Sequence, residues 1–225
     1  MRSIPNAKRL HLKKQRLWLL PQKALFWEKK KILMIADPHL GKAEHFRRNG
    51  IPVPGSVNTT NLELLDRLLK AVEVEHLITL GDLFHSRHNR EWDHFFEWRA
   101  KHRALEVTLV IGNHDILERD TYHSSRINLF HKLRIGPFLL VHDLSKVQFD
   151  PQKPGYLLSG HVHPAIQLRG KGRQSMKLPC FYFGNNQGIL PAFGEFTGTH
   201  VIKPKPEDKV FAVVDGHLIP IQELT

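Results

Sequence analysis

Short apolar runs that end abruptly in polar residues most constrain what this chain can fold into. Each run holds four or five residues rich in Ile, Leu, Val and Phe: residues 32–36, 77–80, 107–111, 138–141 and 156–159. Runs of this length, bounded by glycine and polar residues, are typical of strands buried on both faces of a sheet. The sequence therefore predicts a sheet-based core.

Helical patterns lie between these runs. Residues 61–73 place leucines on one face and charged residues largely on the other, and residues 91–105 form a second such stretch. Strands that alternate with helices predict an α/β sandwich. The second stretch carries four aromatic residues that are expected to pack on the core, with stacking on nucleic-acid bases as the alternative: Trp92, Phe95, Phe96 and Trp98.

Two further apolar runs extend the pattern toward the ends of the chain. Residues 17–20 and 210–214 predict additional strands, and Asp215-Gly216 predicts a hairpin turn after the second run. The chain shows no internal repeat and no linker of low complexity. We therefore expect a single domain over residues 1–225.

The charge of the chain favours a polyanionic partner. Its 225 residues include 33 Lys and Arg against 22 Asp and Glu, a formal net charge of +11. Nucleic acid is the first candidate and an anionic membrane surface the second. Four stretches that contain no acidic residue carry much of this charge, which predicts a basic binding groove: residues 8–16, 29–31, 47–48 and 169–177.

The cysteine content and the N-terminal sequence indicate in which cellular compartment the protein is expected. One cysteine, Cys180, excludes an intramolecular disulfide and a cysteine-rich zinc site, and it is expected in a buried strand. The basic N-terminus lacks the continuous apolar segment of a signal peptide. No run approaches the roughly 18 apolar residues of a membrane span. We expect a soluble cytoplasmic protein.

Polar residues that can bind a metal ion follow each of the five runs. The carboxyl ends of strands in an open α/β sheet meet at one edge, so these side chains are expected to converge: Asp37, His39, Asp82, Asn113, His142, His161 and His163. Seven ligands suit two cations about 3.5–4 Å apart. A mixture of Asp, Asn and His without thiolate favours Mn, Fe or Zn over calcium. Each motif alone is more often structural, for example a simple turn, whereas the complete ordered set indicates a metal site.

The motifs in this order resemble the five signatures of the calcineurin-like metallophosphoesterases: Asp37-x-His39, Gly81-Asp82, Gly112-Asn113-His114-Asp115, His142 and Gly160-His161-x-His163. Residues 40–54, 178–181 and 190–198 are similar to a bacterial branch, the DNA-ligase-associated metallophosphoesterases, known as DNA-damage-response endonucleases. The resemblance implies a four-layer α/β/β/α sandwich with a dimetal site at the strand carboxyl ends. His142-Asp143 departs from the His-Gly of many members, which keeps the ligand and changes the neighbouring loop.

The resemblance also implies a role for each ligand. One ion would be held by Asp37, His39 and His163, and the other by Asn113, His142 and His161, with Asp82 bridging them. A metal-activated hydroxide would attack the phosphodiester. His114 would protonate the leaving oxygen, and Asp115 would orient or charge its imidazole.

Five further residues are candidate substrate contacts because they lie in segments that follow ligand-bearing strands: Arg47, Arg48, His85, Arg87 and His88. A structural or solubilising role is the alternative for each of them. The expected cofactors are two divalent transition-metal ions, with Mn placed before Fe and Zn.

The leading functional hypothesis is a metal-dependent phosphodiesterase that acts as a DNA endonuclease in DNA repair. The alternative is a phosphatase, or a phosphodiesterase of nucleotides or other small molecules, since the same ligands serve those reactions. A binding protein without activity would lack at least one ligand, and none is missing. The expected partners are DNA that is single-stranded or has single-stranded regions and, by resemblance, a DNA ligase, helicase and exonuclease; no membrane is expected.

Overall fold

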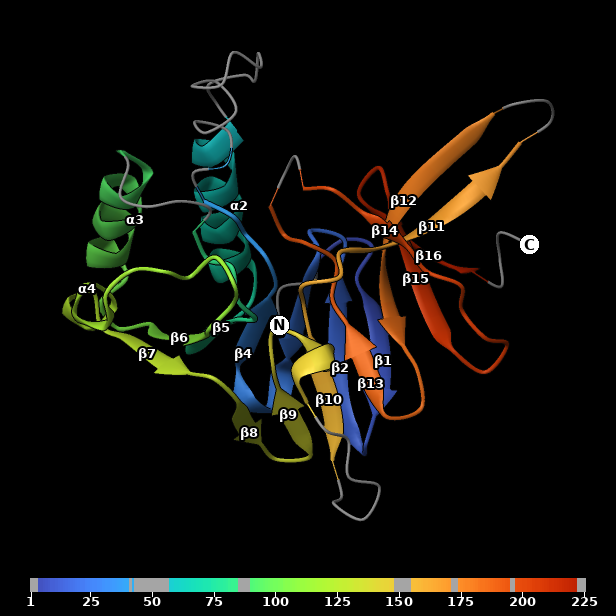
Figure 1. The fold of residues 1–225 in the computed structure, drawn as a ribbon, viewed down its shortest axis with the longest axis horizontal. Helices are drawn as coiled ribbons and strands as arrows, with labels where there is room; N and C mark the ends of the chain where they lie inside the picture. The colour runs from blue at the N-terminus through green and yellow to red at the C-terminus, as the bar shows by residue number, and fades with distance from the viewer. Residues whose placement is uncertain are drawn as a thin grey trace.

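The computed structural model describes residues 4–40, 42, 57–84, 90–147, 155–170, 174–194 and 197–221. These residues form two sheets and a helical layer (Figure 1).

The first sheet has seven strands in the order of the sequence. They are β1 (Lys8–Leu12), β2 (Gln15–Leu20), β3 (Ala24–Trp27), β4 (Ile32–Ile35), β5 (His76–Thr79), β6 (Glu106–Val110) and β7 (Ile127–Phe130). Neighbours pair antiparallel from β1 to β4 and parallel from β4 to β7. Parallel neighbours require long crossovers, and these hold α2 (Val57–Ala71), α3 (Arg90–Lys101) and α4 (Arg119–Ser124). A short 3-10 helix, η1 (Glu28–Lys30), joins β3 to β4.

The second sheet has nine strands and is built from the C-terminal half of the chain. They are β8 (Leu133–Ile135), β9 (Phe138–Leu140), β10 (Tyr156–Ser159), β11 (Pro164–Arg169), β12 (Ser175–Phe183), β13 (Gln187–Ile189), β14 (His200–Val201), β15 (Lys209–Val214) and β16 (His217–Pro220). β10 lies parallel to both β9 and β13. A second 3-10 helix, η2 (Leu144–Lys146), follows β9.

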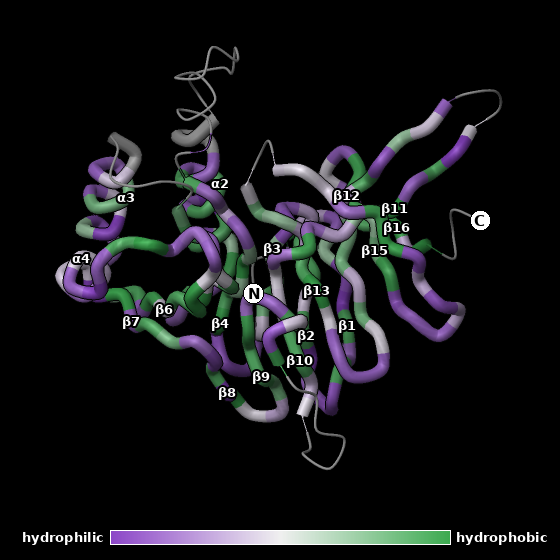
Figure 2. Tube along the Cα trace, viewed as in Figure 1, coloured by the Kyte–Doolittle hydropathy of each residue, from purple (hydrophilic) through white to green (hydrophobic). Residues whose placement is uncertain are grey.

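Two hydrophobic cores lie on the two faces of the first sheet. In β4, Leu33 and Ile35 pack with the helices, whereas Ile32 and Met34 pack with the second sheet. Hydrophobic residues accordingly gather along strands such as β4, β9 and β10, and hydrophilic residues in the loops (Figure 2). Burial on both faces explains why these strands read as continuous apolar runs.

The predicted elements are confirmed. The five apolar runs form β4, β5, β6, β9 and β10, and the two predicted helices are α2 and α3. Asp215 and Gly216 have φ values of 45° and 73° and form the turn between β15 and β16. Helices α2, α3 and α4 all pack on the first sheet, so within the described residues the sandwich has its α layer on that side.

The aromatic face of α3 is part of the core, as predicted. Trp92, Phe95 and Trp98 are each at most 4% exposed. Cys180 is fully buried in β12, and desolvation raises the pKa of its thiol to about 12.

No helix within the described ranges is long and apolar enough to cross a membrane.

Candidate metal centre

All seven predicted ligands lie in loops at the carboxyl ends of strands. Asp37 and His39 follow β4, Asp82 follows β5 and Asn113 follows β6 in the first sheet. The other three come from the second sheet, where His142 follows β9 and His161 and His163 follow β10. The packing of the two sheets brings these five loops together.

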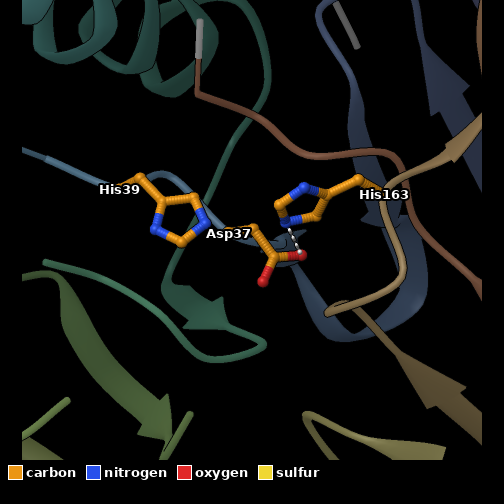
Figure 3. Close-up of side chains that lie close together, drawn as sticks. All are labelled: Asp37, His39 and His163. Atoms are coloured by element: carbon orange, nitrogen blue, oxygen red, sulfur yellow. Dashed lines mark ion pairs between the residues drawn. The ribbon is translucent and has the colours of Figure 1, made fainter. Parts of the chain in front are cut away.

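Asp37, His39 and His163 form the first cluster. Their ligand atoms all lie within 4.8 Å of one another. The two rings flank the Asp37 carboxylate, and His163 Nε2 is 3.6 Å from Asp37 Oδ2 (Figure 3). Asp37 is fully buried, and its Oδ1 accepts no hydrogen bond within the described structure. A buried carboxylate oxygen without a donor is costly, and a bound cation would satisfy it.

Asp82, His142 and His161 form the second cluster, again within 4.8 Å. His142 Nδ1 donates to the Leu80 carbonyl at 3.0 Å, which turns Nε2 toward Asp82 Oδ1 at 3.5 Å. His142 Nε2 is also 3.1 Å from His161 Nδ1. Two nitrogens bound to one ion at about 2.0–2.1 Å lie roughly 3 Å apart, so this spacing fits shared ligation.

Asp82 lies between the two clusters. Its Oδ1 faces His142, and its Oδ2 is 3.9 Å from Nε2 of His39. The clusters also meet where His142 Nδ1 is 3.6 Å from Asp37 Oδ1. One oxygen of Asp82 thus faces a histidine of each cluster, so Asp82 is placed to be shared by two ions.

Asn113 lies at the edge of the second cluster. Its Nδ2 is 3.5 Å from His161 Nδ1, and its Oδ1 accepts a hydrogen bond from Lys146 Nζ. We did not anticipate Lys146, which lies in η2. For Asn113 Oδ1 to bind an ion, its hydrogen bond with the Lys146 ammonium must first break.

The unusual Asp143 places a carboxylate beside a ligand. Its Oδ2 is 3.8 Å from His161 Nε2, the nitrogen that faces away from His142. Desolvation acts to raise the pKa of Asp143, but two hydrogen bonds from Ser145, together with the charges of His161 and Lys146, outweigh it and lower the pKa. An ionised carboxylate there can fix the ring orientation of His161.

Asp115 joins two ligand loops. Its carboxylate accepts backbone hydrogen bonds from Gly112 and Asp82 at 2.8 Å and from Leu83 at 2.9 Å. Desolvation raises the pKa of Asp115 to about 6, although these hydrogen bonds oppose the shift. Asp115 therefore holds the Asp82 loop against the Asn113 loop, a contribution that we did not predict.

His114 lies beside the first cluster. Its backbone N–H donates to Asp82 Oδ1 at 2.9 Å, and its exposed ring lies 5.5 Å from the His39 ring, centroid to centroid. The ring thus lies beside the first cluster without belonging to either cluster.

The five predicted substrate contacts, Arg47, Arg48, His85, Arg87 and His88, lie outside the described residues. Lys42 is a basic residue near the clusters that we did not single out. Burial lowers the pKa of its ammonium, while the charges of Asp82 and Asp37 oppose this shift.

Unfavourable backbone geometry recurs in the ligand loops. Five predicted ligands have φ values between 44° and 69°, a region that costs residues with a Cβ roughly 1–2 kcal/mol each. They are Asp37, His39, Asp82, His161 and His163. Such strain persists where the surrounding structure enforces it, and it commonly marks functional sites.

Glycines before the ligands permit close approach between loops. A Cβ on Gly160 would lie 2.5 Å from Asp37 Oδ2 and 2.9 Å from the Leu80 carbonyl oxygen. At Gly81, where φ is +80°, a Cβ would overlap the ring of His142. The Gly-Asp and Gly-His pairs of the sequence are therefore packing requirements of the centre.

Substitution of Gly160 by alanine is expected to weaken metal binding about 10- to 100-fold, because Asp37 must move. Metal content and affinity, measured by mass spectrometry and calorimetry, check this. Gly155→Ala is the control, because Gly155 precedes β10 at the end remote from the ligands and a Cβ there lies 3.1 Å from the flexible Arg134 guanidinium. Equal metal affinity in the two variants would contradict the packing argument.

The chain is similar to several proteins of known structure. The nuclease MPE of Pseudomonas putida is 34% identical, with a TM-score of 0.80, over 96% of this chain and 100% of that chain. YfcE, a phosphoesterase from E. coli, is 12% identical with a TM-score of 0.42, over 84% of this chain and 96% of that chain. AQ665 from Aquifex aeolicus is 18% identical with a TM-score of 0.40, over 86% of this chain and 96% of that chain.

No curated protein is significantly similar in sequence. The profile of the calcineurin-like phosphoesterases matches residues 30–161, more than half of the sequence. The chain therefore belongs to the calcineurin-like phosphoesterase family.

Proposed function

We propose that the protein is a metal-dependent phosphodiesterase that cleaves DNA as an endonuclease. The observation that carries this proposal is the pair of adjoining clusters with Asp82 between them. The similarity to a nuclease supports nucleic acid as the substrate class. A role in DNA repair is proposed from the resemblance of the loop segments alone.

The predicted ligands form two sets, one for each of two divalent ions. Asp37, His39 and His163 would hold one divalent ion, and Asn113, His142 and His161 the other, with Asp82 shared. Two such ions, when bound, supply an acidified water and positive charge for the phosphate oxygens. Manganese is proposed first because the ligands combine carboxylate, amide and imidazole without thiolate.

His114 would carry the proton for the leaving oxygen. Its backbone is anchored to Asp82, and its exposed ring lies edge-on to the ring of His39 in the first cluster. A substrate phosphate at the centre would thus lie within reach of the ring. Through its hold on the Asp82 loop, Asp115 would keep this geometry in place.

The hairpin of β11 and β12 is a candidate contact for the DNA backbone. β11 starts directly after His163, and the hairpin projects from the body of the protein (Figure 1). Lys177 pairs with Gln167 and Arg169 with Ser175, so both exposed basic side chains share one face. Six residues of strand extend this face by roughly 20 Å from the centre.

The function is tested by comparing cleavage of single-stranded DNA, duplex DNA, an aryl phosphodiester and an aryl phosphomonoester. We expect DNA and diester cleavage, abolished by a chelator and restored best by Mn²⁺. Rapid monoester turnover without DNA cleavage would overturn the nuclease proposal in favour of a phosphatase.

His114→Ala is expected to retain both ions and to lose roughly 10²–10⁴-fold in DNA cleavage, because the leaving alkoxide needs a proton. Turnover of an aryl diester with a good leaving group should fall much less. His94→Ala, at an exposed position of α3, is the control. Equal losses on both substrates would exclude the acid role.

Arg169→Glu combined with Lys177→Glu is expected to reduce DNA affinity roughly tenfold or more and to flatten its salt dependence, since phosphate contacts release counterions. Turnover of the small diester should stay unchanged. Lys70→Glu with Lys132→Glu changes the net charge equally at exposed positions outside the hairpin. A similar loss in this control would mean that only overall charge matters.

A further inference from the structure

A cavity of about 450 Å³ lies at the edge of the first sheet opposite the metal centre. Its walls come from α3, the residues just after it, and the link between α4 and β7. The lining residues are Phe96, Arg99, Ala100, Arg103, Ser124, Ser125 and Arg126. Arg126 directly precedes β7, whereas the metal ligands follow the carboxyl ends of the parallel strands. We call this space the arginine cavity.

Three arginines and no acidic residue line the arginine cavity. Arg99 is only 6% exposed. Its Nη1 donates to the carbonyl of His102 and its Nη2 to the carbonyl of Arg126 at 3.4 Å, while Nε is buried and has no hydrogen-bond partner among the described residues. The guanidinium is thus fixed in place by neutral carbonyls alone.

A buried cation is normally paired with an anion. Desolvation, followed by the charge of Arg126, lowers the pKa of Arg99, which agrees with a lack of counter-charge. The carboxyl end of α3 contributes only about half a negative charge. Three guanidinium groups therefore keep the arginine cavity strongly positive.

The remaining walls suit the rest of a nucleotide. Phe96 and Ala100 form an apolar side. The hydroxyls of Ser124 and Ser125 both donate to the carbonyl of Thr121, which leaves the arginines as the donors available to an anion. Guanidinium forks match phosphate oxygens, and a cavity of this size holds a small organic ligand.

We propose that the arginine cavity is a second phosphate-binding site, which takes the phosphate of a nucleotide or of a nucleic-acid strand away from the metal centre. Arg103 and Arg126, whose side chains are exposed, would close on the phosphate, and Arg99 would provide a fixed charge behind it. The ligand at this site would be bound and not cleaved, because both clusters found among the described residues lie at the other end of the strands.

The test uses the metal-loaded protein and a double variant, Arg103→Gln with Arg126→Asn. Arg99 is left intact because its hydrogen bonds hold the end of α3. Asparagine tolerates the φ of 56° at position 126. The control, Lys101→Gln with Lys132→Gln, removes the same charge from exposed side chains that do not line the cavity.

Binding of inorganic phosphate, adenosine monophosphate and a cleavage-resistant single-stranded oligonucleotide is measured by calorimetry. The cavity variant is expected to lose about tenfold or more in affinity at one site, the scale of one charge-assisted hydrogen bond. A loss of affinity for adenosine monophosphate would identify a free nucleotide as the ligand of the arginine cavity. Loss with the oligonucleotide alone, together with a salt slope reduced by about 0.7 for each lost contact, identifies the strand backbone.

Wild-type affinity of the cavity variant for all three probes would overturn the proposal, and so would an equal loss in the control. Turnover of the aryl diester should be unchanged in both variants, which confirms that each is folded. Since these measurements need no DNA cleavage, the second site and the nuclease activity can fail independently.

Discussion

The structure is organised around two carboxylates that are buried next to the same histidine. Asp37 and Asp82 are 0% and 3% exposed, and both face His142 within 3.6 Å. Anions removed from water need compensating charge or donors. The strained backbone, the glycines and the Asp115 hydrogen bonds all hold these carboxylates within reach of four imidazoles. The loops thus hold two buried carboxylates whose negative charge a bound cation would compensate.

Much of this arrangement could be predicted, because the buried strands and the predicted ligands are visible as short patterns of neighbouring residues. Strands buried on both faces must be continuously apolar, so β4, β5, β6, β9 and β10 were recognisable, and the ligands directly follow them. Other elements lack such a signal. β12 is exposed at Ser175 and Met176 but buried at Phe181, and α4 has only six residues, too few to show helical periodicity.

The parts of the site that sequence could not reveal depend on contacts between distant segments. Asp115 bonds to Asp82, 33 residues away, and Lys146 bonds to Asn113 at the same separation. The arginine cavity has the same origin. Arg99 and Arg126 are individually unremarkable in sequence, and only the packing of α3 beside the start of β7 brings them together.

The candidate metal centre is built from residues of both sheets. The first sheet supplies the predicted ligands Asp37, His39, Asp82 and Asn113, and the other three predicted ligands come from the second sheet. Each ion would take ligands from both sheets. Bound ions would therefore link the two sheets to each other. Retention of the ions would then report whether the two halves of the chain have packed together.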